Sequence, residues 1–219
     1  IKNRCRVNDE IILVVSAGPS LDVNQIKEDM EMLEEGNKTV KLVCVKHSLP
    51  LLMENNVIPW GCTLLDPRPI DGISTHGVVR STLFKNINPR TNFLVASMTD
   101  PSVVDLLQEK EANIIGWHAF SDAVKGGIEG TGEEALMITG GTNAGLRTIG
   151  IGHTLGFREF HLYGFDMSLG KEPSEEEQEA KDEEGKPKYL NVSVGDENFW
   201  TTGELLAGGQ DLEKLFKTC

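Results

Sequence analysis

The chain has 219 residues, of which 39% are hydrophobic, and its formal net charge is −13. This length suits one α/β domain with a buried core, and the negative charge argues against nucleic acid as a partner, because affinity for its phosphates comes largely from clustered Lys and Arg. No apolar run reaches the roughly 18 residues of a membrane span, and residues 1–10 lack a signal-peptide core. We therefore expect a cytoplasmic protein without a membrane span.

Apolar strand-like runs alternate with helical patterns along most of the chain. Strands are expected over residues 11–15, 40–45, 62–65, 92–96, 113–117 and 159–164. The first expected helix places Val23, Ile26, Met30 and Leu33 on one face and stops at Gly36. Further helices are expected after a cap at Ser48, after Asp100-Pro101, and from a cap at Thr142 or Asn143 to Leu155. This alternation predicts an α/β fold, namely a doubly wound, mostly parallel Rossmann-like sheet with helices on both faces.

The second half of the chain adds two polar or glycine-rich segments to this pattern. A glycine-rich passage over 126–132 suggests loops above a pocket. Residues 171–186 hold eight acidic residues against three lysines and almost no apolar side chain, which predicts a solvated insertion or lid at about 171–188 within a single domain 1–219. Thr201-Thr202-Gly203-Glu204 is typical of a capping box, and the helix after it is expected to bury its apolar side chains, Leu205, Leu206, Leu212, Leu215 and Phe216.

The cysteines show no pattern of metal binding or disulfide pairing. Cys5, Cys44, Cys62 and Cys219 form no C-x-x-C pair, and Cys44 and Cys62 lie inside apolar runs. We expect all four to be reduced core thiols.

The first predicted strand runs directly into a Gly-Pro-Ser turn and then a helix. Such a junction suits a phosphate, because glycine allows close approach of the backbone and the helix start offers unpaired N–H groups. The candidate nucleotide-binding residues here are Ala17, Gly18, Pro19 and Ser20. The alternative is an ordinary strand-to-helix turn with Ser20 or Asp22 as N-cap.

A second glycine-rich helix start provides another candidate phosphate cradle. Its nucleotide-binding candidates are Gly140, Gly141, Thr142, Asn143 and Gly145. In a doubly wound sheet, ligands lie beyond the carboxyl ends of the strands, near the point where strand order reverses. We therefore expect the two glycine-rich segments to meet at one edge of the sheet.

Four charged or titratable residues follow predicted strands and are candidates for chemistry. Lys46 suits a phosphate as a point charge, and His47 is the candidate base for an acceptor alcohol. Asp66 and Asp166 are the candidate metal ligands, because Mg²⁺ prefers oxygen ligands and binds through one or two carboxylates together with substrate phosphates. A turn or capping role is the alternative for each aspartate.

Several of these segments, in order, resemble the 6-hydroxymethylpterin diphosphokinase MptE-like family. The resemblance covers about residues 11–216 and rests on residues 17–22, 45–47, 65–67, 140–145, 155–157, 162–166 and 199–202. It implies a transferase that moves diphosphate from a Mg-nucleotide to a small alcohol. The family includes a domain of the Maf flagellin glycosyltransferases, and its fold is similar to the sialyltransferases of glycosyltransferase family 42.

The resemblance leaves three functions open. The first is MptE-like diphosphate or phosphoryl transfer, and the second is glycosyl transfer from a CMP-sugar or related nucleotide-sugar to a small-molecule or glycan acceptor. The third is nucleotide or glycan binding without turnover, because Ala17 and Ala144 stand where the sialyltransferases carry side chains that bind the nucleotide. No histidine follows Asp166 to match the catalytic base of those sialyltransferases.

Overall fold

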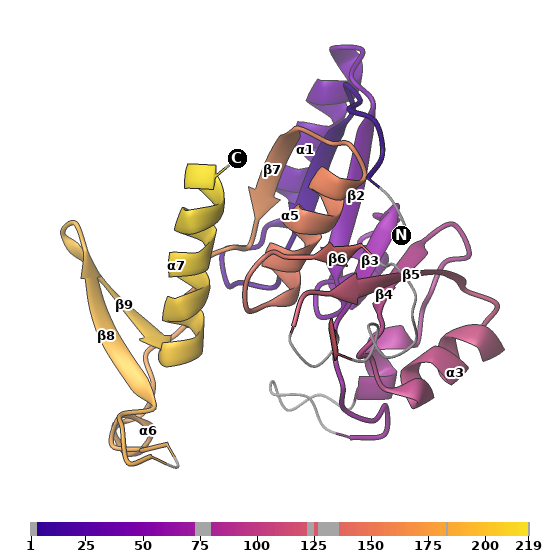
Figure 1. The fold of residues 1–219 in the computed structure, drawn as a ribbon. Coiled ribbons are helices and arrows are strands. Elements are labelled where there is room, and N and C mark those ends of the chain that lie inside the picture. The colour runs from indigo at the N-terminus through magenta and orange to yellow at the C-terminus, as the bar shows by residue number, and fades with distance from the viewer. Residues whose placement is uncertain (1–3, 73–79, 122–124, 127–135, 183, 219) are drawn as a thin grey trace.

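The computed structural model describes residues 4–218 except 73–79, 122–124, 127–135 and 183. Seven strands form one curled, all-parallel sheet in the order β6-β5-β4-β3-β2-β1-β7 (Figure 1). The strands are β1 (Ile11–Val15), β2 (Val40–Val45), β3 (Gly61–Leu64), β4 (Asn92–Ala96), β5 (Asn113–Ala119), β6 (Met137–Ile138) and β7 (Glu159–Tyr163).

The strand β1 shows why both faces of the sheet carry helices. Its alternate residues Ile11, Leu13 and Val15 belong to one buried apolar cluster, whereas Ile12 and Val14 belong to another. The first cluster includes side chains of α1 (Val23–Glu35), α2 (Leu49–Glu54), the 3₁₀ helix η1 (Arg80–Phe84) and α3 (Pro101–Glu109), and the second includes α5 (Ala144–Thr154). Burial on both faces is typical of doubly wound sheets, and the predicted fold class is confirmed.

The order of the strands reverses next to β1. From β1 the chain adds β2, β3, β4, β5 and β6 on one side, and β7 then pairs with the other side of β1. Val15 lies opposite Cys44 of β2 and opposite Tyr163 of β7, so the carboxyl ends of the three strands are level. The sequence predicts a ligand site at this edge of the sheet, and a cavity described below lies there.

The C-terminal part contains a hairpin that the sequence analysis missed. Strands β8 (Tyr189–Val194) and β9 (Glu197–Thr202) pair in antiparallel fashion, and α7 (Gly203–Thr218) follows directly. In Figure 1, α7 lies between the hairpin and the main sheet. The described residues of 171–182 and 184–188 are exposed except Pro173 and two half-buried positions, 178 and 180, and they contain the short helix α6 (Glu175–Gln178). A solvated insertion or lid within a single domain stays a prediction.

The start and the packing of α7 differ from the predictions. Thr202 is the N-cap and accepts a hydrogen bond from the Leu205 N–H (3.3 Å), whereas Thr201 is buried in β9, so the predicted capping box is wrong. Leu206 and Phe216 are 37% and 66% exposed, and the other three leucines are half-buried. The helix α7 packs against β9 and α5 and leaves these two side chains open to solvent.

The structure bears on the cysteines and on the cap at Ser48, and it leaves most of one glycine-rich passage undescribed. Cys44 and Cys62 are buried free thiols, but Cys5 is exposed and so is not a core thiol. Ser48 precedes α2 without capping it, because its hydroxyl faces the carbonyls of Val15 and Val45 (3.1 Å each). The glycine-rich passage 126–132 lies outside the described residues apart from Gly126, and so does Cys219.

Candidate functional site

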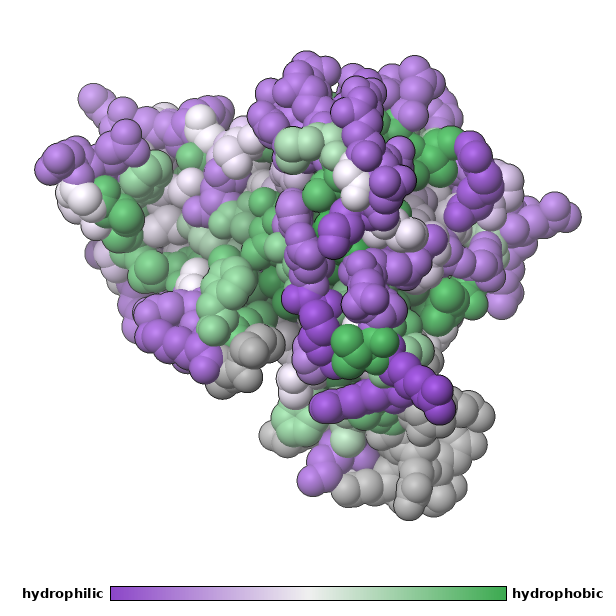
Figure 2. Space-filling model, turned by 90° about the horizontal axis from the view of Figure 1, so that it is seen from above, coloured by the Kyte–Doolittle hydropathy of each residue, from purple (hydrophilic) through white to green (hydrophobic). Residues whose placement is uncertain are grey.

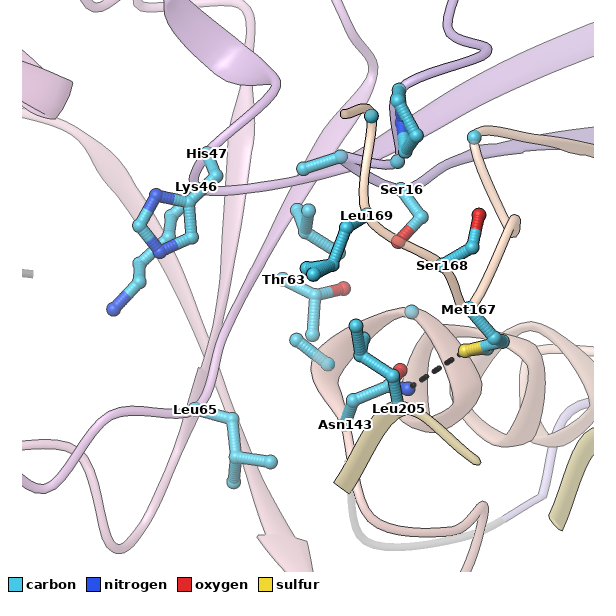
Figure 3. A pocket seen from close by; sticks show the side chains of 18 residues that line it. Ser16, Lys46, His47, Thr63, Leu65, Asn143, Met167, Ser168, Leu169 and Leu205 are labelled. Atoms are coloured by element: carbon cyan, nitrogen blue, oxygen red, sulfur yellow. Dashed lines mark hydrogen bonds between the residues drawn. The ribbon is translucent and has the colours of Figure 1, made fainter. Parts of the chain in front are cut away.

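A cavity of 430 Å³ opens at the carboxyl ends of β1, β2, β3 and β7, where strand order reverses. Figure 3 shows its walls, with Lys46 and His47 on the side opposite Asn143 and Met167. The lining residues are Ser16–Pro19, Val45–His47, Thr63, Leu65, Asn143–Gly145, Gly164, Met167–Gly170 and Leu205. Open α/β sheets bind their ligands at this kind of position.

The turn after β1 is held against the turn after β7. The Gly18 N–H donates to the Gly164 carbonyl (2.9 Å), and the Ser20 N–H donates to Asp166 Oδ2 (3.2 Å). A Cβ atom on residue 18 would lie 2.1 Å from Asp166 Oδ2 and 2.5 Å from the Gly164 oxygen. The glycine at position 18 is therefore required by the close approach of the two turns.

Only part of the predicted first cradle faces the cavity. Ala17, Gly18 and Pro19 line it, but Ser20 does not, and Asp166 already accepts the Ser20 N–H. The start of α1 is capped by Asp22, whose carboxylate accepts from the Asn24 N–H (2.8 Å). The N-cap alternative therefore holds for Asp22, and an anionic cap makes α1 a poor phosphate cradle.

The start of α5 forms the opposite wall. Asn143 caps the helix by accepting from the Leu146 N–H (3.0 Å). Within the described part of the chain, the hydrogen bonds leave the backbone N–H groups of Ala144 and Gly145 without an acceptor. A Cβ atom on residue 145 would lie 3.0 Å from Ser16 Oγ. The two glycine-rich segments thus meet at one cavity, and the start of α5 offers donors to an anion.

The first two glycines of the second candidate phosphate cradle, Gly140 and Gly141, pack against helices and not at the cavity. Gly140 and Gly141 have positive φ angles of 148° and 91°, and they lie against Leu146, Arg147 and Asp211. Neither glycine lines the cavity, and Thr142 does not line it either. Their direct contact with a nucleotide is not supported by the structure, because these glycines serve the packing of α5 against α7.

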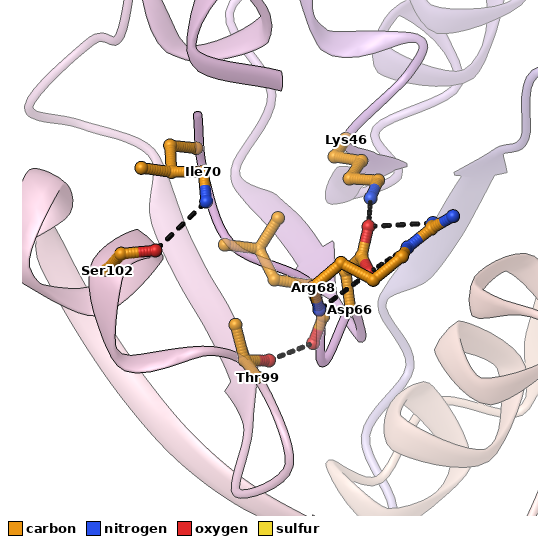
Figure 4. Close-up of polar contacts among 7 residues, drawn as sticks. Lys46, Asp66, Arg68, Ile70, Thr99 and Ser102 are labelled. Atoms are coloured by element: carbon orange, nitrogen blue, oxygen red, sulfur yellow. Dashed lines mark hydrogen bonds and ion pairs between the residues drawn. The ribbon is translucent and has the colours of Figure 1, made fainter. Parts of the chain in front are cut away.

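Lys46 lines the cavity and forms an ion pair with the buried carboxylate of Asp66 (Figure 4). Arg68 binds the same carboxylate through two contacts, Nε to Oδ1 at 2.7 Å and Nη2 to Oδ2 at 2.9 Å. Burial raises the pKa of Asp66, but the hydrogen bonds from Arg68 and Lys46 outweigh it and hold this pKa well below its usual range. The cluster carries two cations and one anion next to the cavity.

The described residues do not fit a Mg²⁺ site made by Asp66 and Asp166 together. Asp66 binds two cations and Asp166 accepts a backbone N–H, and neither lines the cavity of 430 Å³. In the described ranges, no group of three or more His, Cys, Asp or Glu side chains is arranged to hold a metal ion. Mg²⁺ binding stays a prediction, and no chemical step below depends on it.

The sequence analysis missed several lining residues. Met167, Ser168, Leu169 and Gly170 follow the end of β7, so the rule that lists residues after each strand finds them when it is extended past Asp166. Thr63 is a polar residue in an apolar strand, and its hydroxyl is hydrogen-bonded to that of Thr148 (2.8 Å). Leu205 comes from α7, and nothing in the local sequence predicts its place at the cavity.

Together, the parallel sheet and the cavity at its reversal point define an open α/β protein with a candidate ligand site, which is lined by N–H and side-chain donors. The chain belongs to the 6-hydroxymethylpterin diphosphokinase MptE-like family, whose model matches residues 1–172. The hairpin and α7 lie beyond the matched region. No helix in the described part of the chain is long and apolar enough to cross a membrane.

A solved structure extends this likeness to nearly the whole chain. The fold is similar to the MAf glycosyltransferase from Magnetospirillum magneticum AMB-1, with a TM-score of 0.63, 15% identity and coverage of 98% of this chain. This chain spans only 31% of that protein's length. The comparison with curated proteins finds no match. At this identity the structural likeness supports the fold alone.

Proposed function

We propose that the cavity of 430 Å³ binds the phosphates of a nucleotide and that the protein transfers a phosphoryl or diphosphate group to a small alcohol. The observation that carries the proposal is the chemistry of the lining. It contains Lys46, His47, Asn143 and the start of α5. The described residues that line it include no Asp or Glu, although the chain has a net charge of −13. A locally positive site in an acidic protein is suited to a small anion.

The Lys46–Asp66–Arg68 cluster supports a role for Lys46 in phosphate binding. Asp66 is held by both cations, and Arg68 engages both carboxylate oxygens. If Lys46 turns toward a phosphate, Arg68 keeps the buried carboxylate paired, so the cost of an unpaired buried charge is avoided. Lys46 and the α5 N–H groups then neutralise phosphate charge, which is the main requirement in phosphoryl transfer.

The family name supports diphosphate transfer as the leading reaction. In that reaction the acceptor hydroxyl oxygen attacks the β-phosphorus of a nucleoside triphosphate. The bond from this phosphorus to the oxygen bridging to the α-phosphate breaks, and its electron pair stays on the departing nucleoside monophosphate. The hydroxyl proton passes to His47, which lines the same cavity, or to solvent.

The likeness to a glycosyltransferase over 98% of the chain favours one alternative. In it, the same cavity holds the phosphate of a CMP-sugar or related nucleotide-sugar. A small-molecule or glycan hydroxyl oxygen attacks the anomeric carbon of the sugar, the bond from this carbon to the phosphate oxygen breaks, and the nucleotide leaves with the electron pair while the hydroxyl proton passes to solvent. A non-catalytic nucleotide- or glycan-binding protein is the third possibility, and it shares the cavity but not the turnover.

Calorimetric titration with ATP, CTP and CMP, each with and without Mg²⁺, tests the proposal. A nucleotide that binds is expected to raise the free energy of unfolding by about 2.7 kcal/mol when its concentration is 100 times its dissociation constant. We expect Lys46→Met to weaken nucleotide binding by about tenfold or more, and the exposed control Lys38→Met to leave it unchanged.

The outcomes separate the functions. Conversion of ATP to AMP with a new diphosphate ester in ³¹P NMR supports diphosphate transfer, whereas metal-independent binding of CMP without any response to ATP supports glycosyl transfer. Binding without turnover of any donor supports the non-catalytic function. Failure of all three nucleotides to bind, or full affinity in Lys46→Met, contradicts the assignment of the cavity.

A further inference from the structure

A second cavity, of 420 Å³, lies between the β8–β9 hairpin and α7. Its apolar walls are Val192, Val194 and Phe199 from the hairpin and Leu206 from α7. Val194 is 64% exposed, and Phe199 and Leu206 are 38% and 37% exposed, so apolar surface stays open to solvent here. Figure 2 shows hydrophobic side chains gathered in the left part of the view, where Figure 1 places α7 and the hairpin. A volume of this size suits a small molecule.

This second cavity adjoins the proposed nucleotide cavity. Met167 and Ser168 line both cavities and thus form a shared wall. The hairpin is fixed to that wall, because the Leu169 N–H donates to the Trp200 carbonyl (2.7 Å) and the Thr201 hydroxyl donates to the Met167 carbonyl (2.7 Å). A molecule bound between hairpin and helix therefore lies beside a nucleotide bound at the start of α5.

The charges of the two cavities are opposite. Asp166 and Glu213 are among the residues that line the second cavity, and its described lining includes no Lys, Arg or His. Glu213 forms an ion pair with Lys217 (2.5 Å), whereas Asp166 has no cationic partner among the residues that the structure describes. An anionic ligand is repelled at this site, and a neutral or cationic ligand is not.

We infer that this second cavity is the acceptor site, and that the acceptor is an uncharged or cationic alcohol with an apolar ring or chain. The apolar body lies between the hairpin and Leu206, and the hydroxyl lies at the shared wall of Met167 and Ser168, where it reaches the transferred group. This wall is opposite His47, so in this arrangement the hydroxyl proton passes to solvent. This inference rests on the proposed transferase function.

NMR titration with three small probes that share one ring tests the assignment. Benzyl alcohol, protonated benzylamine and benzoate each carry one polar group of similar size on a phenyl ring, and they are neutral, cationic and anionic respectively. Gly209→Leu is the blocking variant, because a Cβ atom on residue 209 meets only Met167 at 3.8 Å, an ordinary contact, and the longer side chain fills the cavity. Phe216→Ala is the control, because Phe216 is an exposed residue of the same helix outside the cavity lining.

We expect benzyl alcohol and benzylamine to bind about tenfold more tightly than benzoate, and Gly209→Leu to weaken benzyl alcohol by about tenfold. Phe216→Ala is expected to leave probe binding unchanged. Equal binding of benzoate, or undiminished binding of benzyl alcohol to Gly209→Leu, overturns the assignment. A third result also overturns it: no probe binds, sedimentation velocity shows a dimer, and Leu206→Glu converts this dimer to monomers. A second copy of the chain then covers this surface.

The same titrations distinguish this inference from the proposed function. If no nucleotide binds but benzyl alcohol responds to Gly209→Leu, the transferase proposal is wrong and a separate ligand cavity remains. If nucleotides bind and no probe does, the acceptor site lies elsewhere and the proposed function stands.

Discussion

Replacing Gly18 with alanine tests whether the close approach of two turns shapes the nucleotide cavity. The new Cβ atom would lie 2.1 Å from Asp166 Oδ2, so the carboxylate must retreat by about 0.9 Å to reach the 3.0 Å that real contacts respect. Its retreat breaks the bond to the Ser20 N–H, and movement of the Gly164 oxygen, 2.5 Å away, strains the bond from the Gly18 N–H.

Overpacking of this kind costs about 1–3 kcal/mol, and the loss of one hydrogen bond about 1 kcal/mol. We therefore expect the free energy of unfolding to fall by about 2–4 kcal/mol in urea denaturation, and ATP affinity to fall by about tenfold as the turns separate. The matched control is Gly116→Ala, because a Cβ atom there meets nothing within 4 Å, and its free energy of unfolding is expected to change by less than about 0.5 kcal/mol. A Gly18→Ala protein with wild-type stability and affinity would refute this reasoning.

The remaining predictions concern buried or half-buried polar groups. Asp66→Asn is expected to cost about 3 kcal/mol at pH 7, and because the pKa of Asp66 is lowered in the folded state, the difference from wild type should shrink as pH falls below about 4 in acid denaturation. Burial and the hydrogen bond from the Tyr163 hydroxyl to Asp29 (2.7 Å) raise the pKa of Tyr163, so the free energy of unfolding of the wild type should fall above about pH 10. Tyr163→Phe should weaken this fall at alkaline pH. An unchanged fall in the variant would contradict the role given to this hydrogen bond. Ser48→Ala removes the hydroxyl that donates to the carbonyls of Val15 and Val45, and we expect the free energy of unfolding to fall by about 1 kcal/mol in thermal denaturation. An unchanged free energy of unfolding would contradict the view that this hydroxyl links the ends of β1 and β2.

The main sheet could be predicted because its central strands are continuous apolar runs. The strand over residues 11–15 was predicted with its observed bounds, because every residue in it is buried. The strand β6 has only two residues, and the hairpin β8–β9 is mostly exposed, so neither produces a strong apolar signal. The exposure of Leu206 and Phe216 depends on which side of α7 meets α5, and helical periodicity alone does not determine it.

The location of the candidate site could be predicted better than the role of each residue in it. The rule that ligands lie after the strands at the reversal point brought Gly18, Lys46 and Gly145 together, and the structure places all three at one cavity. The same rule could not tell that Gly140 packs against α5, or that Asp66 pairs with Lys46 and Arg68. Those roles depend on tertiary contacts between segments that are distant in the sequence.

The most direct test of the nucleotide-binding proposal is a ¹⁵N–¹H correlation spectrum of the protein titrated with ATP. We predict the largest shift changes at the amides of Ala144 and Gly145, with smaller ones at Ser16–Gly18, because these backbone groups line the cavity and the first two lack an acceptor within the described chain. Saturable changes confined to residues outside this cavity, or no changes at all, would contradict the account.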